Sequence, residues 1–305
     1  MDVAVTGSTG LIGSALVDHL TRGGHRVRRL VRPGSRPVPR DVESDAVEWD
    51  PDAGTIDVAA LEGIDAVVHL AGEGIADKRW SDAQKRRIRD SRRLGTSLIA
   101  RTVASLTPRP ALLSGSAIGY YGDAGDRLLD ETAPAGDDFL AGVVTDWEAA
   151  ASPAIDAGAR VVFLRSGIVL SPDGGVLARQ LPFFRFGLGG RSGSGRQYMS
   201  WITLDDEVAA IAYLLESPDG SAVFGPVNMV APNPVTNAEF AKTLGRALHR
   251  PTTIIPMIGP RVLFGRELAD SLLLGSQRLE PAVLTRAGYE FEHPVLDTAL
   301  SDLLA

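Results

Sequence analysis

The first thirteen residues constrain the fold of this chain more than any other part of it. A short apolar run over residues 2–5 leads into a glycine-rich stretch made of Thr6, Gly7, Ser8, Thr9, Gly10, Leu11, Ile12 and Gly13. Apolar residues then recur at the spacing of an amphipathic helix, at Ala15, Leu16 and Leu20. The order predicts a strand, a tight turn and a helix, which is how many α/β folds begin.

Each glycine of the turn has a separate role. Gly7 permits the sharp turn off the strand, Gly10 allows a pyrophosphate to approach the backbone, and Gly13 lets helix and strand pack closely. The N–H groups at the helix start, together with the helix dipole, favour an anion there. A second apolar run begins about twenty residues later, as a dinucleotide-binding fingerprint requires. Residues 6–13 are therefore the predicted dinucleotide site, and the alternative is a tight turn without a ligand.

Composition narrows the class of protein. The 305 residues are 44% hydrophobic and 23% charged, which suits a globular chain of one large or two modest domains. A net charge of -7 argues against nucleic acid or an anionic membrane as a partner. The lack of cysteine excludes disulfides, thiolate metal sites and a Cys nucleophile, and the histidines are too scattered for a metal site. The sequence shows neither a secretory signal nor an apolar run of membrane-spanning length, so we expect a cytoplasmic protein.

The second predicted strand, over residues 25–32, bears on which dinucleotide binds. An Asp or Glu at its end would accept hydrogen bonds from the ribose 2′-OH of NAD, whereas an Arg there can pair with the 2′-phosphate of NADP. This strand ends without an acid, and Arg32, Ser35 and Arg36 stand there instead. The sequence therefore favours NADP(H). The other interpretation is a solvated loop whose arginines bind nothing.

Predicted strands and helices alternate through the first 170 residues. The strands fall around residues 47–49 and over 65–72, 111–116 and 160–165, and the helices over 81–106 and 142–157. This alternation predicts a doubly wound parallel sheet of the Rossmann type. Leu70, Ala71 and Gly72 end one strand, where small residues let the backbone lie against the cofactor. His69 in the same run is expected to be a core histidine rather than a catalyst.

The pattern changes after residue 170. Residues 171–200 are rich in glycine and arginine, which suits either a functional loop for an anionic substrate or an ordered excursion with surface charges. Thr203 predicts the start of a helix that reaches residue 216; a strand over 223–230 and a helix over 236–248 follow. We therefore predict an NADP-binding domain of residues 1–170, rejoined by 203–230. A smaller substrate lobe would contain 171–202 and 231–305, with the active cleft between the two.

Several stretches together resemble a known family. Thr6-Gly7-x-x-Gly10-x-x-Gly13 and Leu70-Ala71-Gly72 are general to extended short-chain dehydrogenases/reductases. More specific motifs are Arg79-Trp80 with Lys85, Ser91-Arg92 and Thr96, the stretches at 114–122, 187–202 and 225–236, and Leu274-Gly275-Ser276-Gln277-Arg278. Over essentially the whole chain, the sequence resembles the epimerase-family (sugar-nucleotide epimerase-like) members that carry a small C-terminal domain of unknown function. The resemblance implies a Rossmann domain that binds NADP(H), and it implies no physiological substrate.

The chain departs from the wider superfamily at the catalytic residues. Those enzymes carry Tyr-x-x-x-Lys on the helix after a hydroxyl-ended strand, where the Tyr is the acid/base and a Ser or Thr holds the substrate oxygen. Ser116 falls at the strand position, but residues 138–148 contain neither the Tyr nor the Lys. Tyr120 and Tyr121 follow the strand and are candidate acids beside Ser116, as is Tyr198. Adjacent tyrosines can equally be packing residues.

The other motif residues are candidates for a substrate pocket. They are Lys85, Arg92, Arg196, Gln197, Tyr198 and Trp201. The leading interpretation is an NADP(H)-dependent oxidoreductase or epimerase-like enzyme with a small substrate, either anionic or a sugar nucleotide. The alternative is a non-catalytic NADP(H)-binding sensor or interaction protein, which the missing Tyr-x-x-x-Lys favours. The sequence leaves the oligomeric state open.

Overall fold

The computed structural model describes residues 1–34 and 44–305, and its largest element is one sheet of eight strands. Neighbouring strands are parallel throughout, except that β4 pairs antiparallel with β3 at one edge. From edge to edge the order is β13 (Gly225–Met229), β8 (Val161–Ser166), β6 (Ala111–Ala117), β5 (Ala66–His69), β1 (Asp2–Thr6), β2 (Arg26–Val31), β3 (Ser44–Asp50) and β4 (Thr55–Ile56). The predicted doubly wound Rossmann class is confirmed.

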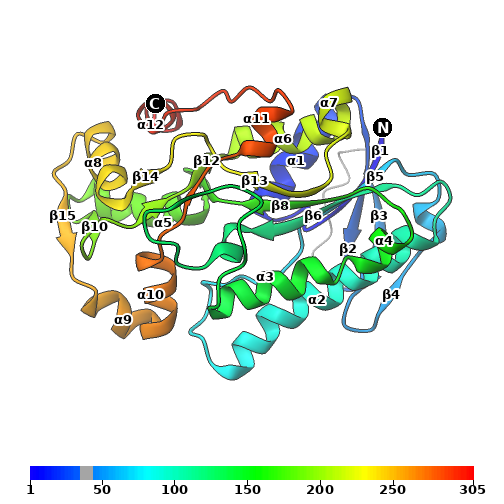
Figure 1. Cartoon of the computed structure of the whole chain (residues 1–305), viewed down its shortest axis with the longest axis horizontal. Helices are drawn as coiled ribbons and strands as arrows, with labels where there is room; N and C mark the ends of the chain where they lie inside the picture. The colour runs from blue at the N-terminus through cyan, green and yellow to red at the C-terminus, as the bar shows by residue number, and fades with distance from the viewer. Residues whose placement is uncertain (35–43) are drawn as a thin grey trace.

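Helices cover both faces of this sheet (Figure 1). On one face lie α1 (Leu11–Arg22), α6 (Leu204–Glu216) and the short α11 (Ala282–Arg286), with α7 (Pro218–Ser221) after α6. On the other lie α2 (Asp82–Ser105), α3 (Phe139–Ala149) and α4 (Ser152–Asp156). Two 3-10 turns, η1 (Ala59–Leu61) and η2 (Ile118–Tyr121), complete this part of the chain.

The strands are buried on both faces because their apolar residues are consecutive. In β1, Val3 and Val5 join the core under α1 and α6, whereas Ala4 joins the core on the α2 side. β5 repeats the alternation with Val68 and Val67. Such runs are typical of parallel strands covered by helices on both sides. The apolar run before the glycine turn is thus a central strand, held between β2 and β5.

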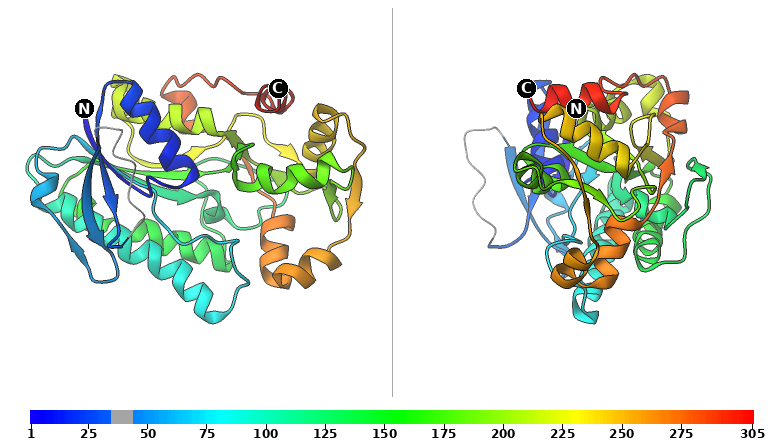
Figure 2. Two further views of the ribbon diagram at one scale, coloured as in Figure 1. Left: turned by 180° about the vertical axis from the view of Figure 1, so that it is seen from behind. Right: turned by 90° about the vertical axis from the view of Figure 1, so that its left-hand side faces the viewer.

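A smaller lobe with a third core lies at the end of the molecule away from β4 (Figure 2). Its helices are α5 (Gly175–Arg185), α8 (Asn237–Ala247), α9 (Ile258–Phe264), α10 (Arg266–Leu274) and α12 (Leu296–Leu303). Its short strands pair as β9 (Ile168–Ser171) with β12 (Trp201–Thr203), β10 (Gly190–Ser192) with β15 (Thr253–Ile255), and β11 (Tyr198–Met199) with β14 (Val235–Thr236). A fourth pair, β7 (Leu128–Leu129) with β16 (Arg278–Leu279), joins two distant segments.

Three details refine the sequence-based expectations. Of the two interpretations of residues 171–200, the structure supports an ordered excursion, because α5, β10 and β11 occupy most of them. The predicted helix over 142–157 is two helices, since Pro153 in the first turn of α4 cannot donate the backbone hydrogen bond that would continue α3. Leu284 of α11, assigned by sequence to the smaller lobe, packs in the core under α1 and α6. The rest of the domain division stays a prediction.

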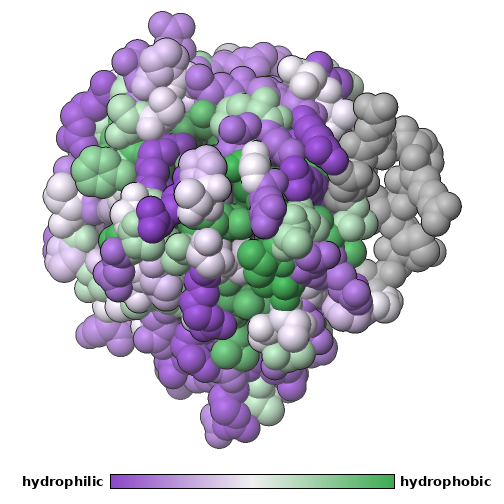
Figure 3. All heavy atoms as spheres, turned by 90° about the vertical axis from the view of Figure 1, so that its right-hand side faces the viewer, coloured by the Kyte–Doolittle hydropathy of each residue, from purple (hydrophilic) through white to green (hydrophobic). Residues whose placement is uncertain are grey.

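Figure 3 looks onto the side of the molecule that carries β4, where hydrophobic residues lie among hydrophilic ones. An open pocket of about 400 Å³ lies there, lined by β4 and by the last turns of α2, Leu98 to Ser105 among them. The end of α2 precedes β6, so it lies at the amino edge of the sheet, opposite the glycine turn. Among the described residues, no helix is long and apolar enough to cross a membrane.

Candidate functional site

The glycine turn between β1 and α1 is tightly packed at two of its three glycines. Gly7 has a φ of 68°, and a Cβ on it would lie 2.8 Å from the carbonyl carbon of Leu70. A Cβ on Gly13 would lie only 2.2 Å from the carbonyl oxygen of Gly7. Gly10 is different, because its Cβ would meet only that same oxygen, at 3.3 Å. Gly7 and Gly13 therefore shape the turn, and Gly10 leaves an open side for a ligand.

The start of α1 leaves its backbone donors free of any side-chain cap. Its N-cap is Gly10, which has no side chain to accept a hydrogen bond. Other helices are capped by a side-chain oxygen, at Ser81 for α2, Asp138 for α3, Thr203 for α6 and Thr236 for α8. Uncapped N–H groups at a helix start, with the dipole behind them, suit a phosphate. α5, with Gly174 as its N-cap, also lacks a side-chain cap, so it is the glycine turn before α1 that distinguishes the start of α1 as a place for an anion.

Thr6 ties the turn to the loop after β5. Its hydroxyl oxygen accepts hydrogen bonds from the N–H groups of Leu70 and Ala71, at 3.1 and 3.2 Å. The hydroxyl also lies within hydrogen-bond distance of Nδ1 of His69, at 2.7 Å. Complete burial lowers the pKa of His69 to about 4, so this histidine stays neutral. His69 is thus a core residue, as expected, and it helps to hold Leu70, Ala71 and Gly72 beside the turn.

Strand register brings the motifs to one edge of the sheet. Thr6 pairs with Leu30 of β2 on one side and with His69 of β5 on the other. His69 pairs in turn with Ser114 of β6, so Ser116 follows two residues beyond that point. The glycine turn, the loop after β5 and Ser116 therefore lie in sequence along the carboxyl edge, where doubly wound sheets bind ligands.

The predicted 2′-phosphate site can be placed only in part. Arg32 is exposed and follows directly after the end of β2, beside the glycine turn. Ser35 and Arg36 lie outside the described residues. Arg32 therefore stands where the prediction needs a cation, and Ser35 stays a prediction from sequence alone.

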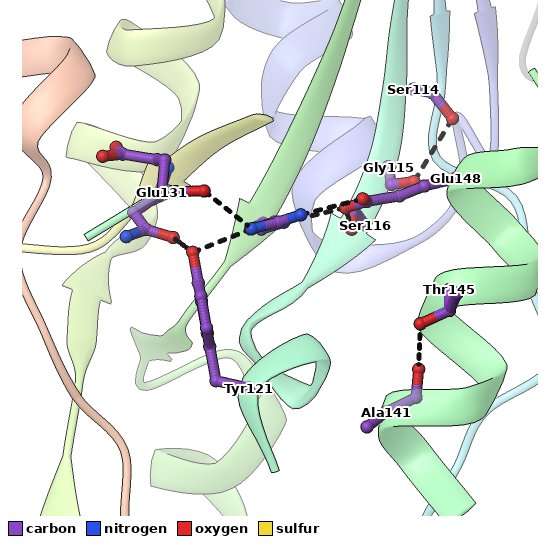
Figure 4. Close-up of polar contacts among 10 residues, drawn as sticks. Ser114, Gly115, Ser116, Tyr121, Glu131, Ala141, Thr145 and Glu148 are labelled. Atoms are coloured by element: carbon purple, nitrogen blue, oxygen red, sulfur yellow. Dashed lines mark hydrogen bonds and ion pairs between the residues drawn. The ribbon is translucent and has the colours of Figure 1, made fainter. Parts of the chain in front are cut away.

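Ser116 is hydrogen-bonded to a carboxylate from α3 (Figure 4). Its hydroxyl donates to Oε1 of Glu148 over 2.6 Å. Glu148 in turn accepts two hydrogen bonds from Arg165, one on each oxygen and both 2.9 Å long. The Arg165 side chain is 3% exposed and that of Glu148 14%. Burial alone would lower the pKa of Arg165, but the bonds and charge of Glu148 outweigh it and raise that pKa.

The two candidate tyrosines have different surroundings. Tyr121 is 3% exposed, and its hydroxyl donates to Oδ1 of Asn228 and accepts from Arg165, at 2.7 and 3.0 Å. Burial raises the pKa of Tyr121 to about 12, although Arg165 opposes the shift. Tyr120 is half-buried, with its ring centroid 3.5 Å from the guanidinium carbon of Arg165. The hydroxyl of Tyr121 is engaged within the protein, and its surroundings favour a positioning role.

α3 presents no tyrosine or lysine toward this site. Ala141, Thr145 and Glu148 lie on successive turns of the helix, and Glu148 extends toward Ser116 (Figure 4). α3, Phe139–Ala149, contains neither a tyrosine nor a lysine, so this helix supplies no Tyr-x-x-x-Lys pair. The Thr145 hydroxyl donates to the backbone oxygen of Ala141, at 2.9 Å. Glu148 is therefore the residue of α3 that reaches the strand hydroxyl.

Arg92 lies against the loop after β5. Its guanidinium donates to the backbone oxygen of Glu73 at 2.9 Å and lies 4.9 Å from the ring centroid of Trp147. Ser91 accepts a hydrogen bond from the N–H of Glu73, at 3.1 Å. Burial lowers the pKa of Arg92 to about 10, and the charge of Glu73 opposes that shift. Ser91 and Arg92 thus bind the N–H and the carbonyl oxygen of Glu73, and so fix the chain just after Gly72.

Lys85 links the two lobes. Its ammonium lies 2.5 Å from Oε1 of Glu267 in α10 and 4.9 Å from the ring centroid of Phe139 in α3. The structure therefore gives Lys85 a partner across the lobe boundary, while its proposed contact with a substrate stays a prediction.

The predicted substrate residues of the smaller lobe do not share one environment. Trp201 has no exposed surface and donates its indole N–H to a backbone carbonyl. Gln197 is 8% exposed and donates its amide to two backbone carbonyls. Tyr198 is half-buried under the guanidinium of Arg278, and Arg196 is exposed. Trp201 and Gln197 therefore support the lobe from inside, and Tyr198 and Arg196 are the two with surface to offer a ligand.

Glu207, in the first turn of α6, is a buried acid outside these motifs. It has no exposed surface, and its Oε1 accepts a hydrogen bond from Ser166 at 2.5 Å. Its Oε2 is buried without a hydrogen-bond partner among the described residues. Burial raises the pKa of Glu207 from 4.5 to about 7, although the bond from Ser166 opposes the shift.

Glu207→Gln should therefore stabilise the protein in alkaline but not in acidic solution. In the unfolded chain this carboxyl ionises near pH 4.5, and in the folded chain near 7, so stability is lost as pH rises through that window. At pH 8 the free energy of unfolding of the Glu207→Gln variant should therefore exceed that of the wild type by on the order of 3 kcal/mol. Urea unfolding at about pH 4 and pH 8 measures the difference. The exposed Glu62→Gln should show none, and an equal effect of Glu207→Gln at both pH values would contradict the burial argument.

The sequence did not single out three residues of the Ser116 network as site residues: Glu148, Arg165 and Asn228. A signal was available for two of them. Arg165 is a charged residue near the end of an otherwise apolar strand, and Glu148 is an acid on the helix where the superfamily carries its catalytic pair. Within residues 1–34 and 44–305, acidic and histidine side chains form no group of three that could hold a metal ion.

Comparison with protein families gives two matches. Residues 3–229 match the NAD dependent epimerase/dehydratase family, and residues 255–303 match a domain of unknown function, DUF1731. An epimerase family protein of Mycobacterium bovis is 48% identical over 299 residues, which are 98% of this chain and 96% of that protein.

Solved structures that are similar over the full length of this chain include a human and a bacterial protein. The human epimerase family protein SDR39U1, crystallised with NADPH, has a TM-score of 0.88 and 35% identity, covering 100% of this chain and 99% of that one. A nucleoside-diphosphate sugar epimerase from Corynebacterium glutamicum has a TM-score of 0.79 and 39% identity. That comparison covers 100% of this chain and 58% of the longer one.

Proposed function

The chain belongs to the NAD dependent epimerase/dehydratase family, and from this membership we propose that it is an NADP(H)-dependent oxidoreductase or epimerase-like enzyme acting on a small molecule. The observation that carries the proposal is the glycine turn. Its open side at Gly10 and the uncapped start of α1 fit the pyrophosphate of a dinucleotide. The human relative crystallised with NADPH supports the same cofactor.

The residues around the turn suit the other parts of the cofactor. Arg32, exposed beyond β2, would pair with the 2′-phosphate that distinguishes NADP from NAD. Leu70, Ala71 and Gly72 would lie against the nucleotide, held by Thr6 and His69. A bound nicotinamide supplies one chemical step, the reversible transfer of a hydride to or from a substrate carbon. Ser116 would hold the substrate oxygen at the edge of the sheet.

The charged residues around the site favour an anionic substrate. Tyr198 and Arg196 of the smaller lobe, together with Arg92 and Lys85 of α2, would favour an anionic molecule. A sugar nucleotide is the class that the Corynebacterium glutamicum relative suggests by its name. The cytoplasmic location expected from the sequence is likewise a prediction.

Nicotinamide fluorescence tests the proposal directly. The purified protein is titrated with NADPH and NADH and then offered a panel of carbonyl compounds and sugar nucleotides. Tight NADPH binding with consumption of a panel member would support an enzyme. Failure to bind either nucleotide would overturn the proposal. Binding without turnover would favour the second candidate, a non-catalytic NADP(H)-binding sensor, for which the specific observation is that α3 contains neither a tyrosine nor a lysine.

Arg32→Glu should weaken NADPH binding about a hundredfold and leave NADH binding within about threefold, because it repels the 2′-phosphate alone. Competition titrations at low and high salt measure both affinities. Arg101→Glu, an exposed change near the far end of α2, should alter neither. Equal losses of affinity for NADPH and NADH would show that Arg32 does not bind the 2′-phosphate.

A further inference from the structure

We propose that Glu148 accepts and returns the proton of the reaction through the hydroxyl of Ser116, in place of the tyrosine that related enzymes carry on this helix. The inference rests on the proposed function and deepens it. It starts from the polar group of α3 that contacts the strand hydroxyl, which is a carboxylate at 2.6 Å.

The direction of the hydrogen bond decides what Ser116 offers a substrate. A carboxylate can only accept, so the hydroxyl hydrogen of Ser116 points to Glu148. The lone pairs of Ser116 Oγ are then left for a donor. A substrate hydroxyl is such a donor, whereas a carbonyl oxygen is not. When Glu148 is ionised, Ser116 Oγ can accept a hydrogen bond from the alcohol form of the substrate. When Glu148 is protonated and donates to Ser116, the Ser116 hydroxyl can donate to the carbonyl form.

The proton path balances with hydride transfer. In the oxidative direction the C–H hydrogen leaves with its electron pair to the nicotinamide, and the substrate C–O bond becomes a carbonyl. The hydroxyl proton passes to Ser116 Oγ as the proton of Ser116 passes to Oε1 of Glu148. The products are a ketone or aldehyde, the reduced nucleotide and a protonated Glu148. Reduction runs the same path in reverse.

Neighbouring groups fix Glu148 for this role. Arg165 binds both carboxylate oxygens at 2.9 Å, so the side chain cannot turn away from Ser116 without breaking a bidentate pair. On its far side Arg165 donates to the hydroxyl of Tyr121, which in turn donates to Asn228. Tyr121 itself is a poor proton donor to a substrate, because its hydroxyl is buried and is already hydrogen-bonded to Asn228 and Arg165. Arg165, Tyr121 and Asn228 are therefore positioning residues.

A binding experiment tests the placement of Glu148 without any substrate. The oxidised nicotinamide ring carries a positive charge and the reduced ring does not, so a carboxylate beside the ring favours NADP+ over NADPH. We expect Glu148→Gln to weaken NADP+ binding about tenfold and to change NADPH binding less than about threefold. Asp146→Asn is the matched control, since it removes a carboxylate two residues away that is 46% exposed and paired with Arg89. It should leave both affinities unchanged.

The outcomes separate this inference from the proposed function. If wild-type protein binds neither nucleotide, both fall together. If it binds both, but Glu148→Gln changes them equally or not at all, the role of Glu148 is overturned and the proposed function stands. Circular dichroism checks that the variant is folded. If Glu148→Gln unfolds, Glu148→Asp is measured instead. Its carboxylate is one methylene further from the nicotinamide ring, so the ratio of NADP+ affinity to NADPH affinity should fall about threefold.

Turnover of a carbonyl compound found in the panel tests the relay itself. Ser116→Ala keeps the ion pair of Glu148 with Arg165, so the NADP+ preference should persist while kcat falls about a hundredfold or more. Glu148→Gln should lower kcat to a similar degree with KM nearly unchanged, and the double variant should lose little more than either. Full activity in either single variant would overturn the relay.

Discussion

Gly13→Ala is expected to abolish NADPH binding and to weaken the fold. The new Cβ would lie 2.2 Å from the carbonyl oxygen of Gly7, which is backbone and cannot turn aside as a side chain can. Either α1 moves away from β1 or the turn is displaced, and both changes spread the N–H groups that would hold the pyrophosphate. Overpacking of this kind costs about 1–3 kcal/mol of folding free energy. We expect a loss in NADPH affinity of at least about a hundredfold, which is about 3 kcal/mol.

Fluorescence titration and urea unfolding measure the two effects of Gly13→Ala. Gly259→Ala in α9 is the control, because a Cβ there would meet no atom within 4 Å and should change neither quantity. NADPH affinity equal to wild type in a folded Gly13→Ala protein would show that the turn is not the pyrophosphate site.

Arg165→Met should destabilise the protein strongly. It removes a guanidinium whose side chain is 3% exposed and leaves the carboxylate of Glu148, 14% exposed, without its partner. Breaking a buried ion pair by removing one member costs about 3–5 kcal/mol, because the remaining charge stays buried. The hydroxyl of Tyr121 also loses a donor. Urea unfolding, followed by circular dichroism, measures the change.

The double variant Arg165→Met with Glu148→Leu should recover most of that stability, since it leaves no unpaired charge. Arg179→Met is the surface control. Its partner is Asp77, and with the two side chains 62% and 54% exposed it should cost less than about 1 kcal/mol. If Arg165→Met cost no more than Arg179→Met, the pair would not hold this site together.

The fold could be predicted from the sequence because its signals are local. Val3, Ala4 and Val5 form a run that only a strand covered on both faces can bury, and Gly7 follows it at the turn. The order of such runs and the helices between them leaves few topologies once right-handed crossovers are assumed. The Rossmann class followed from this pattern, and the structure confirms it, whereas strand ends differ by a few residues: β5 ends at His69 and leaves Leu70 to Gly72 in the following loop.

The candidate site was harder to predict because its parts are distant in the sequence. Ser116 could be named from the end of its strand, but its partners come from the next helix and strand, at Glu148 and Arg165. A glutamate at position 148 is as consistent with an exposed side chain as with a buried ion pair, so the sequence alone does not distinguish the two. Tyr121 is a candidate acid by its place after the strand, and the sequence does not reveal its burial or its hydrogen bond to Asn228.

Trp201 shows what a sequence motif leaves undetermined. Its motif was specific enough to suggest a family, yet the motif does not distinguish a residue that touches a ligand from one that supports the lobe. The structure puts the side chain in the third core with no exposed surface. Such distinctions depend on tertiary packing, which no local pattern in the sequence encodes.

The C-terminal stretch contributes to both parts of the molecule, and this has a consequence for truncation. Leu284 completes the core under α1 and α6, while Leu296, Ala299 and Leu300 complete the core of the smaller lobe. The segment matched as a separate domain, residues 255–303, thus shares buried side chains with two cores that the rest of the chain builds. We expect a chain cut after residue 254 to leave both cores open to water, so that neither lobe folds as it does in the whole protein.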